Sequence, residues 1–235
     1  MIRAVLIWLA LAAPSLACEA MTHRERAFTI CTADLDRHAV SLHLNGADGT
    51  PLGNFNALER VVDDLAFAMN AGMYHPDRRP VGLYVEDGVE ANSIVTRAGP
   101  GNFGMLPNGV FCVTADRAVV VESLAFAAAA PACDHATQSG PMLVIDGELH
   151  PRFIPDSTFL NLRNGVGASD DGRRVHFVIS DEPVSFHEMA TLFRDVLSVR
   201  NALYFDGRVS RLHAPAIGRS DGGRAMGPIV AVTVR

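Results

Sequence analysis

The stretch RVHFVISDEPVSFHEMATLFRDVLSVRNALYFDGRVS, residues 174–210, has the pattern of a strand, a helix and a second strand. An apolar run over residues 175–179 stops before Pro183, as expected for a buried strand that enters a loop. Residues 202–205 form a second continuous apolar run. Continuous runs joined by a helix are typical of neighbouring parallel strands covered on both faces, so the sequence predicts a strand–helix–strand unit over 174–206.

The helix of this unit has a clear start signal. Ser185 and Glu188 have the S-x-x-E spacing of a capping box, and Val184 and Met189 are placed to make a hydrophobic staple. The apolar residues that follow recur at helical spacing: Phe186, Met189, Ala190, Phe193, Val196 and Leu197. The sequence therefore predicts an amphipathic helix that begins at residue 185 and buries one face.

The second strand of the unit ends at Asp206-Gly207. Loop residues at the carboxyl ends of strands in an α/β unit face a crevice, which makes Asp206 the first candidate for chemistry. The alternative is that Asp-Gly forms only a tight turn. The pattern alone leaves both interpretations open.

Composition narrows the classes of function. The chain has 235 residues, a formal net charge of −6 and no basic cluster, which argues against nucleic acid or an anionic membrane surface as the main partner. All twenty basic residues are arginine. The absence of lysine excludes a Walker lysine and a Schiff-base lysine, so anions must be bound by arginine or by backbone N–H groups.

Residues 1–17 have the features of a cleaved export signal. Arg3 precedes an apolar run over 4–13, and small residues stand at positions −3 and −1 of a cleavage site after Ala17. We expect the mature protein, residues 18–235, to be a single periplasmic or secreted domain without a transmembrane segment. Cleavage before Cys18 leaves lipidation of that residue as an alternative.

Export predicts that the four cysteines form disulfides, because disulfides persist in oxidising compartments. Four cysteines allow three pairings. We expect the local one, Cys18 with Cys31 and Cys112 with Cys133, since each bond closes a short loop. No C-x-x-C spacing is present, which argues against a structural zinc site.

The N-terminal half has strand patterns, and two motifs at different places in the chain fail. Residues 27–32 and 40–44 predict an early hairpin that ends at the turn signals Asn45-Gly46 and Asp48-Gly49. The G-x-G-x-x-G spacing at 99–104 contains Pro100 and opens no helix, so it is no dinucleotide fingerprint. His187-Glu188 begins an H-E-x-x-H motif, but Thr191 replaces the second histidine.

Four motifs in order resemble the phosphodiester glycosidase family, from about residue 67 to near the C-terminus. They are N-A-G-M-Y (70–74) with V-G-L (81–83), Q-S-G-P-M-L-V (138–144) with D-G (146–147), Arg163 with Gly167, and N-A-L-Y-F-D-G (201–207) with Ser210. No single motif is specific to the family, but the occurrence of all four in the same order is specific. The family's D-G-G-G-S is D-G-R-V-S here, and Gln138-Ser139 stands where glycines are usual.

The resemblance implies an α+β fold with large, mostly antiparallel sheets and helices packed on them. It also implies hydrolysis of the bond between a sugar's anomeric carbon and a phosphodiester. Carried onto this chain, it assigns the catalytic positions to Asp206, Asn70 and Arg163. The substrate-binding positions that it implies are Gly72, Gln138, Ser139, Gly140, Gly207 and Ser210.

The residues are compatible with that chemistry. Cleavage of a glycosyl phosphate needs carboxylates beside an oxocarbenium-like centre and positive or N–H donors around the phosphate. Asp206 and Arg163 fit these roles, whereas Glu86 and Asp146 are expected in hairpin turns, so the second carboxylate has no candidate. No cofactor or metal site is predicted, and a divalent cation such as calcium remains open. The altered glycine motif favours one alternative, a catalytically inactive glycan-binding or envelope-assembly protein on the same scaffold.

Overall fold

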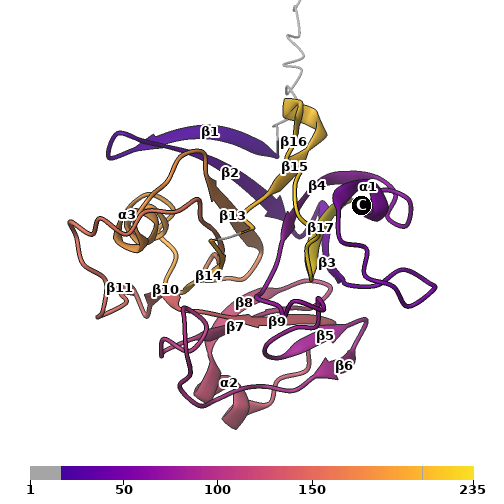
Figure 1. Cartoon of the computed structure of the whole chain (residues 1–235), viewed down its shortest axis with the longest axis horizontal. Coiled ribbons are helices and arrows are strands. Elements are labelled where there is room, and N and C mark those ends of the chain that lie inside the picture. The colour runs from indigo at the N-terminus through magenta and orange to yellow at the C-terminus, as the bar shows by residue number, and fades with distance from the viewer. Residues whose placement is uncertain (1–16, 208) are drawn as a thin grey trace, which may run out of the picture.

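The computed structural model describes residues 17–207 and 209–235, and its regular structure is mostly antiparallel β-sheet (Figure 1). The predicted α+β class with large antiparallel sheets and packed helices is therefore confirmed. The export signal predicted for residues 1–17 lies almost wholly outside the described residues, as does Arg208.

The largest sheet has seven strands in the order β1-β2-β13-β12-β14-β10-β11. Its strands are β1 (Cys18–His23), β2 (Arg26–Asp34), β10 (Met142–Ile145), β11 (Glu148–Leu149), β12 (Asn164–Ala168), β13 (Arg174–Ser180) and β14 (Ala202–Asp206). All its pairings are antiparallel. Its strands β13 and β14 are the two strands predicted in residues 174–210.

Two five-stranded antiparallel sheets complete the fold, with the orders β16-β15-β4-β17-β3 and β6-β5-β9-β7-β8. The first contains β3 (His38–His43), β4 (Leu65–Asn70), β15 (Leu212–Ala214), β16 (Arg219–Ser220) and β17 (Ile229–Val234). The second contains β5 (Tyr84–Glu86), β6 (Val89–Asn92), β7 (Gly109–Val113), β8 (Ala118–Glu122) and β9 (His135–Ser139).

The helices are short. They are α1 (Phe55–Leu58), α2 (Ser123–Ala129) and α3 (Phe186–Thr191), with a π-helical turn η1 (Leu192–Val196) that continues α3 and a 3₁₀ turn η2 (Pro215–Ile217). In residues 17–207 and 209–235, no helix has the length and apolar character needed to cross a membrane.

The predicted start of α3 is confirmed. The Ser185 side chain accepts a hydrogen bond from the Glu188 backbone N–H (3.1 Å), and the Glu188 carboxylate accepts one from the Ser185 N–H (2.7 Å). Val184 and Met189 are both buried in one apolar cluster with the helix face. The capping box thus fixes where the chain turns from β13 into α3.

The prediction that strands 174–180 and 202–206 are neighbours is wrong. β12 lies between β13 and β14 and pairs antiparallel with both. Its sequence is rich in glycine because the packing is close: a Cβ at Gly165 would lie 2.6 Å from the Leu203 carbonyl oxygen, and one at Gly167 would lie 2.9 Å from Val199. This strand lacks the β-branched pattern by which strands are recognised in a sequence.

The predicted early hairpin is also wrong. β2 pairs with β1 and β13, whereas β3 pairs with β17 in another sheet. The chain crosses between the two sheets at residues 35–37, where Leu35 is 2% exposed in the shared core. The turn signals at 45–49 do form a turn, closed by a hydrogen bond from the Gly46 N–H to the Thr50 carbonyl oxygen.

The three sheets meet at a cluster of four buried phenylalanines. Phe177 contributes from the seven-stranded sheet and packs edge-on against Phe67 of β4 (5.6 Å) and Phe111 of β7 (5.8 Å). Phe111 also packs against Phe205 of β14 at 6.3 Å. All four side chains are inaccessible to solvent. This contact sets the position of β14, the strand that ends in Asp206.

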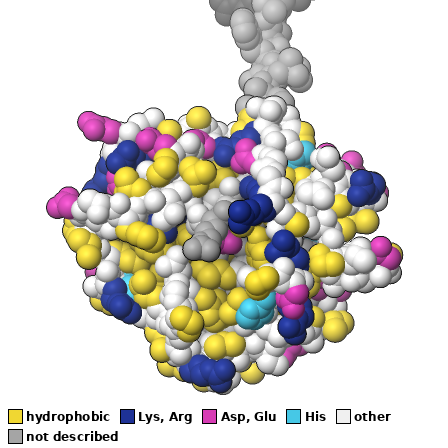
Figure 2. All heavy atoms as spheres, viewed as in Figure 1, with side chains coloured by type: hydrophobic (Ala, Val, Ile, Leu, Met, Phe, Trp, Pro, Cys, Tyr) yellow, Lys and Arg dark blue, Asp and Glu magenta, His cyan; other side chains and the backbone are white. Residues whose placement is uncertain are grey.

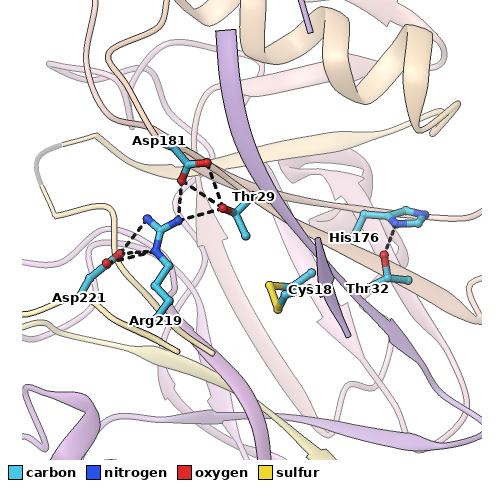
Figure 3. The surroundings of a disulfide bond; sticks show 8 residues. Cys18, Thr29, Thr32, His176, Asp181, Arg219 and Asp221 are labelled. Carbon is cyan, nitrogen blue, oxygen red and sulfur yellow. Dashed lines mark hydrogen bonds and ion pairs between the residues drawn. A yellow bond between two sulfur atoms is a disulfide. The ribbon is translucent and has the colours of Figure 1, made fainter. Parts of the chain in front are cut away.

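Both predicted disulfides are present. Cys18 and Cys31 are paired directly across β1 and β2, and both residues are buried in the core where the sheets pack (Figure 3). Cys112 of β7 is bonded to Cys133, which lies on the segment before β9. Each bond joins segments that are already neighbours in the folded chain.

Removal of the Cys112–Cys133 bond by a double serine substitution should cost about 3 kcal/mol in the free energy of unfolding, because the bond restricts the conformations of the unfolded chain by closing a loop in it. The two residues are 21 positions apart. Urea unfolding of the oxidised protein and the double variant measures this difference. A loss below about 1 kcal/mol would show that the bond does not restrain the unfolded chain.

Candidate functional site

Asp206 is the last residue of β14 and lies opposite Asn164 of β12, at an irregularity in the pairing of the two strands. Its backbone N–H donates to the Asn164 side-chain oxygen (3.1 Å), and its carboxylate accepts a hydrogen bond from the Gly207 N–H (2.6 Å). The residue is partly exposed and lines a cavity of about 620 Å³. The predicted position at the end of a buried strand is therefore observed.

A buried pair of amides supports this position. Asn70 ends β4 and Asn164 begins β12, and neither side chain is accessible to solvent. Each amide donates to the other (3.3 and 3.1 Å), and the Asn164 amide also donates to the Asn70 carbonyl oxygen (2.9 Å). The Asn70 side-chain oxygen accepts from the Arg211 N–H at 2.8 Å. The pair joins two sheets and holds both ends of the loop after Asp206.

Gly207 and Ser210 shape the same loop. A Cβ at position 207 would lie 2.1 Å from the Tyr204 hydroxyl, so only glycine fits over that ring. The Ser210 hydroxyl donates to the Asp206 carbonyl oxygen at 2.7 Å and lies 3.3 Å from the Asn164 side-chain oxygen. Both predicted residues thus lie beside Asp206, and both hold the loop in place.

The cavity beside Asp206 is lined by a tyrosine and by cationic side chains. Tyr74, Arg78 and Arg224 face it, and the Arg78 guanidinium lies 5.6 Å from the centre of the Tyr74 ring. Burial raises the pKa of Tyr74, and the negative charge of Asp206 raises it further. The phenol therefore keeps its proton at neutral pH. The cavity brings together one carboxylate, two guanidinium groups, His75 and a neutral hydroxyl that donates to the Ala225 carbonyl oxygen (3.4 Å).

A second cavity of about 400 Å³ lies on the other side of the Asp206 loop and is lined by Gly207, Ser210 and Arg211. Arg219 also lines it, but its guanidinium is held by Asp181, by Thr29 (2.9 Å) and by Asp221 (3.0 Å), as Figure 3 shows. Asp181 and Asp221 also line this cavity, and the single Arg219 guanidinium offsets the charge of only one of these two carboxylates.

Arg163 does not reach either cavity. Its side chain is fully buried, with Nε donating to the Val184 carbonyl oxygen (2.8 Å) and Nη2 to the Phe159 carbonyl oxygen (3.1 Å). Its guanidinium lies 3.7 Å from the centre of the Phe186 ring. Burial lowers its pKa. The geometry gives Arg163 a supporting position under β14, in place of the expected phosphate contact.

Gln138 is likewise engaged inside the protein. Its side-chain oxygen accepts from the N–H groups of Leu83 (3.1 Å) and Val95 (2.9 Å), and its amide nitrogen donates to the Val95 carbonyl oxygen (2.6 Å) and the Ser123 hydroxyl (2.9 Å). Three of these bonds tie β9 to segments before β7, and the fourth ties it to the start of α2. Its side chain has no capacity left for a substrate.

The other three predicted binding residues are buried close to Gln138. The Ser139 hydroxyl donates to the Phe205 carbonyl oxygen at 2.8 Å. A Cβ at Gly72 would lie 2.3 Å from the Thr137 hydroxyl oxygen, and one at Gly140 would lie 2.6 Å from Asn108. All three positions are set by close packing behind β14.

The structure thus brings together part of the predicted set. Asp206, Gly207, Ser210 and Asn70 form one local unit at the end of β14. Arg163 and the group around Gln138 lie behind it in the core. The four positions Asn70, Gln138, Arg163 and Asp206 therefore do not all open onto one cavity.

Neither Glu86 nor Asp146 lines the cavity beside Asp206. Glu86 accepts a hydrogen bond from the Tyr84 hydroxyl (2.6 Å), and burial raises its pKa. Asp146 occupies the β10–β11 turn with Gly147, both at positive φ, as predicted. In the described part of the chain, no group of three or more histidine, cysteine, aspartate or glutamate side chains is arranged to hold a metal ion.

Sequence reasoning missed Asn164, Arg211 and the cationic lining of the cavity. Asn164 had a usable signal, since an amide between Arg163 and Gly165 in a strand without charges must find a partner when it is buried. Tyr74 lay inside a quoted motif but was given no role. Arg78 and Arg224 lie in loops far apart in the sequence, and only the folded chain brings them to the cavity beside Asp206.

Substitution of Asn164 by alanine should lower the free energy of unfolding by roughly 2–3 kcal/mol, because it leaves the Asn70 amide and the Asp206 N–H without their buried partner. Urea unfolding measures this loss. Asn161→Ala is the matched control, since the hydrogen bonds between Asn161 and Val184 are formed by the backbone. Equal effects of the two substitutions would contradict the supporting role of the amide pair.

Comparison with known structures supports the fold. The catalytic domain of zebrafish N-acetylglucosamine-1-phosphodiester alpha-N-acetylglucosaminidase, auto-inhibited by its pro-peptide, matches 93% of this chain and 82% of its own, with a TM-score of 0.63 and 14% identity. A Burkholderia pseudomallei protein described as a "putative exported protein" matches 88% of this chain and 74% of its own, with a TM-score of 0.60 and 14% identity. At these identities the matches establish the fold alone.

Sequence comparison establishes the family. The uncharacterized protein YigE of Escherichia coli K12 is 32% identical over 185 residues, which cover 77% of this chain and 72% of that protein. The family model for phosphodiester glycosidases matches residues 63–219, the part that contains the amide pair, Asp206 and the loop that follows. The chain belongs to the phosphodiester glycosidase family.

Proposed function

We propose that this protein is an exported hydrolase that cleaves the bond between the anomeric carbon of a sugar and a phosphodiester. The observation that carries the proposal is the position of Asp206. A buried amide pair holds its backbone, and its carboxylate lines a cavity with Arg78 and Arg224. A carboxylate opposite guanidinium groups matches the charges of a sugar that becomes positive and a phosphate that is negative.

In the proposed reaction, the bond between C1 of the sugar and the bridging oxygen breaks, and the oxygen of water forms a new bond to C1. The products are the free sugar and a phosphate monoester, which takes one proton of the water. Asp206 stabilises the positive charge that develops at C1 or accepts the proton of the attacking water. A phosphate monoester is a good leaving group, so the bridging oxygen needs little protonation by a general acid as it leaves.

The phosphate is assigned to the other side of the cavity. Arg78 and Arg224 supply positive charge, and a guanidinium can bind phosphate oxygens through two parallel N–H groups. The raised pKa of Tyr74 keeps its phenol protonated at neutral pH, so this hydroxyl is a neutral hydrogen-bond donor. In this proposal these three side chains bind the phosphate, which is the role that the sequence predicted for Arg163.

Two further observations support the substrate class and the location. The zebrafish structural neighbour is named for a sugar 1-phosphodiester, which matches the proposed substrate. Export is supported by the pattern of residues 1–17, by the two disulfides and by a structural neighbour described as exported. We extend both properties to this protein as part of the proposal.

The test is incubation of the purified protein with a panel of sugar 1-phosphodiesters, with methyl, aryl and nucleotide esters, followed by measurement of released sugar. We expect multiple turnovers with at least one member. Saturable binding of glycans without turnover across the panel would favour the alternative, an inactive glycan-binding protein of the cell envelope.

Asp206→Asn should lower turnover by about 100-fold or more while changing stability by less than about 0.5 kcal/mol. Asparagine keeps the oxygen that accepts the Gly207 N–H, so the loop should survive. Asp146→Asn, at the other Asp-Gly end of a strand in the same sheet, is the matched control. Unchanged turnover in Asp206→Asn would show that Asp206 has no catalytic role and only forms the turn.

Arg224→Gln should weaken binding of the phosphodiester about tenfold and leave binding of the free sugar unchanged, because only the phosphate loses a charged partner. Exposed Arg97 provides the control, Arg97→Gln. Arg163→Gln should act differently and lower the unfolding temperature, since it breaks buried bonds. Selective loss of phosphodiester affinity in Arg163→Gln, with normal stability, would reverse this assignment.

A further inference from the structure

The second cavity, on the other side of the Asp206 loop, has no role in the proposed reaction. Its volume of about 400 Å³ lies within the range of roughly 300–1,000 Å³ that is typical of ligand pockets. The anomeric carbon and the phosphate are assigned to the first cavity, which is lined by Asp206, Arg78 and Arg224. The second cavity is therefore available for another part of the substrate.

The two cavities are neighbours. Val209 lines both of them, and Gly207, which directly follows Asp206, lines the second. Arg211 also lines the second cavity, and its guanidinium donates to the carbonyl oxygen of Arg224, a residue of the first. A ligand bound beside Asp206 therefore needs only to extend past Val209 to enter the second cavity.

The charges that line the second cavity are balanced in the described part of the chain. Asp181 and Asp221 supply two carboxylates, and Arg219 and Arg211 supply two guanidinium groups. Burial lowers the pKa of Arg211, and the Asp221 carboxylate is among the groups that oppose this effect. Figure 2 likewise shows basic and acidic side chains interspersed over the visible face. A wall without net charge favours a neutral polar ligand over a phosphate or a metal cation.

The charged groups of this wall are held in place and are still accessible. Asp221 accepts hydrogen bonds from the Leu212 N–H (3.0 Å) and Arg219 Nη2 (3.0 Å), and Asp181 accepts one from the Thr29 hydroxyl (3.0 Å). In Figure 3 the Arg219 guanidinium lies between Asp221 on one side and Asp181 on the other. These three charged side chains keep between 23% and 30% of their surface exposed. Donors and acceptors fixed in this way lose little side-chain entropy when a ligand binds.

This set of groups fits the hydroxyls of a saccharide. A hydroxyl donates one hydrogen bond and can accept two, so neighbouring hydroxyls of one ring can donate to a carboxylate and accept from a guanidinium. Leu162, which is 42% exposed, and Val209 add apolar surface to the same cavity. Apolar side chains suit the C–H groups of a sugar ring. The lining therefore matches a neutral ring that carries several hydroxyls.

The position of the cavity decides which part of the substrate it takes. The leaving group is bonded to the phosphate, whose proposed partners Arg78 and Arg224 line only the first cavity. The second cavity is lined instead by residues that follow Asp206 in the loop, and Asp206 is assigned to the anomeric carbon. A group in the second cavity is therefore attached to the sugar and not to the phosphate.

We propose that the second cavity binds a second saccharide unit, joined by a glycosidic bond to the sugar whose anomeric carbon lies beside Asp206. The substrate class is then an oligosaccharide 1-phosphodiester. This inference rests on the proposed function for the placement of the first sugar. The bond between the two saccharide units stays intact, so the product is a reducing oligosaccharide that occupies both cavities.

Isothermal titration calorimetry with reducing disaccharides and their monosaccharides tests the proposal without any need for turnover. The pairs are chitobiose with N-acetylglucosamine, mannobiose with mannose, and maltose, cellobiose and lactose with glucose. At least one disaccharide should bind about tenfold more tightly than its monosaccharide, as expected for one additional hydrogen bond to a charged group.

Two substitutions connect this gain with the second cavity. Leu162→Trp places a larger ring at an exposed position of the wall, so it should remove the gain and leave the affinity for the monosaccharide unchanged. Asp221→Asn should lower the affinity for the disaccharide by about tenfold, because a charged acceptor is lost. Leu160→Trp is the matched control, since Leu160 is 38% exposed on the same loop and lines neither cavity.

Disaccharides that bind no more tightly than their monosaccharides, or a gain that survives in Leu162→Trp, would overturn the proposal. A gain lost equally in Leu160→Trp would also overturn it. Hydrolysis of methyl monosaccharide 1-phosphodiesters by the wild type reports on the proposed function separately. If that hydrolysis occurs and the second unit adds no affinity, only the present inference fails. If the second unit adds affinity and no diester is hydrolysed, the proposed function fails and the cavity still binds a saccharide.

Discussion

The buried amide pair Asn70–Asn164 is the interaction on which the site depends. Each amide satisfies the other, and together they also bind the N–H groups of Asp206 and Arg211, which lie at the two ends of one loop. A buried amide without a partner is costly, so this arrangement tolerates little movement. The amide pair therefore fixes the position of Asp206 at the junction of the two sheets.

The layer under the site is equally constrained. Arg163 is buried against Phe186 and bound to backbone carbonyl oxygens, and Tyr204 fills the space under Gly207. The close approach of β12 to its neighbours requires glycines at 165 and 167. Rigid packing behind β14 leaves one side of the Asp206 loop exposed, and a stable scaffold of this kind can hold a candidate site in a defined geometry.

Much of this could be predicted from local pattern, and the failures have physical causes. The capping box at Ser185, the disulfides and the turn at Asp146 depend on neighbouring residues or short loops, and they were predicted correctly. β12 was missed because tertiary packing, which selects its glycines, overrides strand propensity. Arg163 was expected to bind phosphate because a sequence does not show burial. The position of Asp206 was predicted, whereas its support by Asn164 and its arginine neighbours required the fold.

The central claim is that the anomeric centre of the substrate binds beside Asp206. Its most direct test is a crystal structure with a non-hydrolysable analogue, a sugar 1-C-phosphonate monoester. The account predicts the anomeric carbon within about 3.5 Å of the Asp206 carboxylate, the distance of a reactive complex, and the phosphonate beside Arg224. Binding of the analogue in another cavity, with Asp206 making no contact to it, would contradict the account.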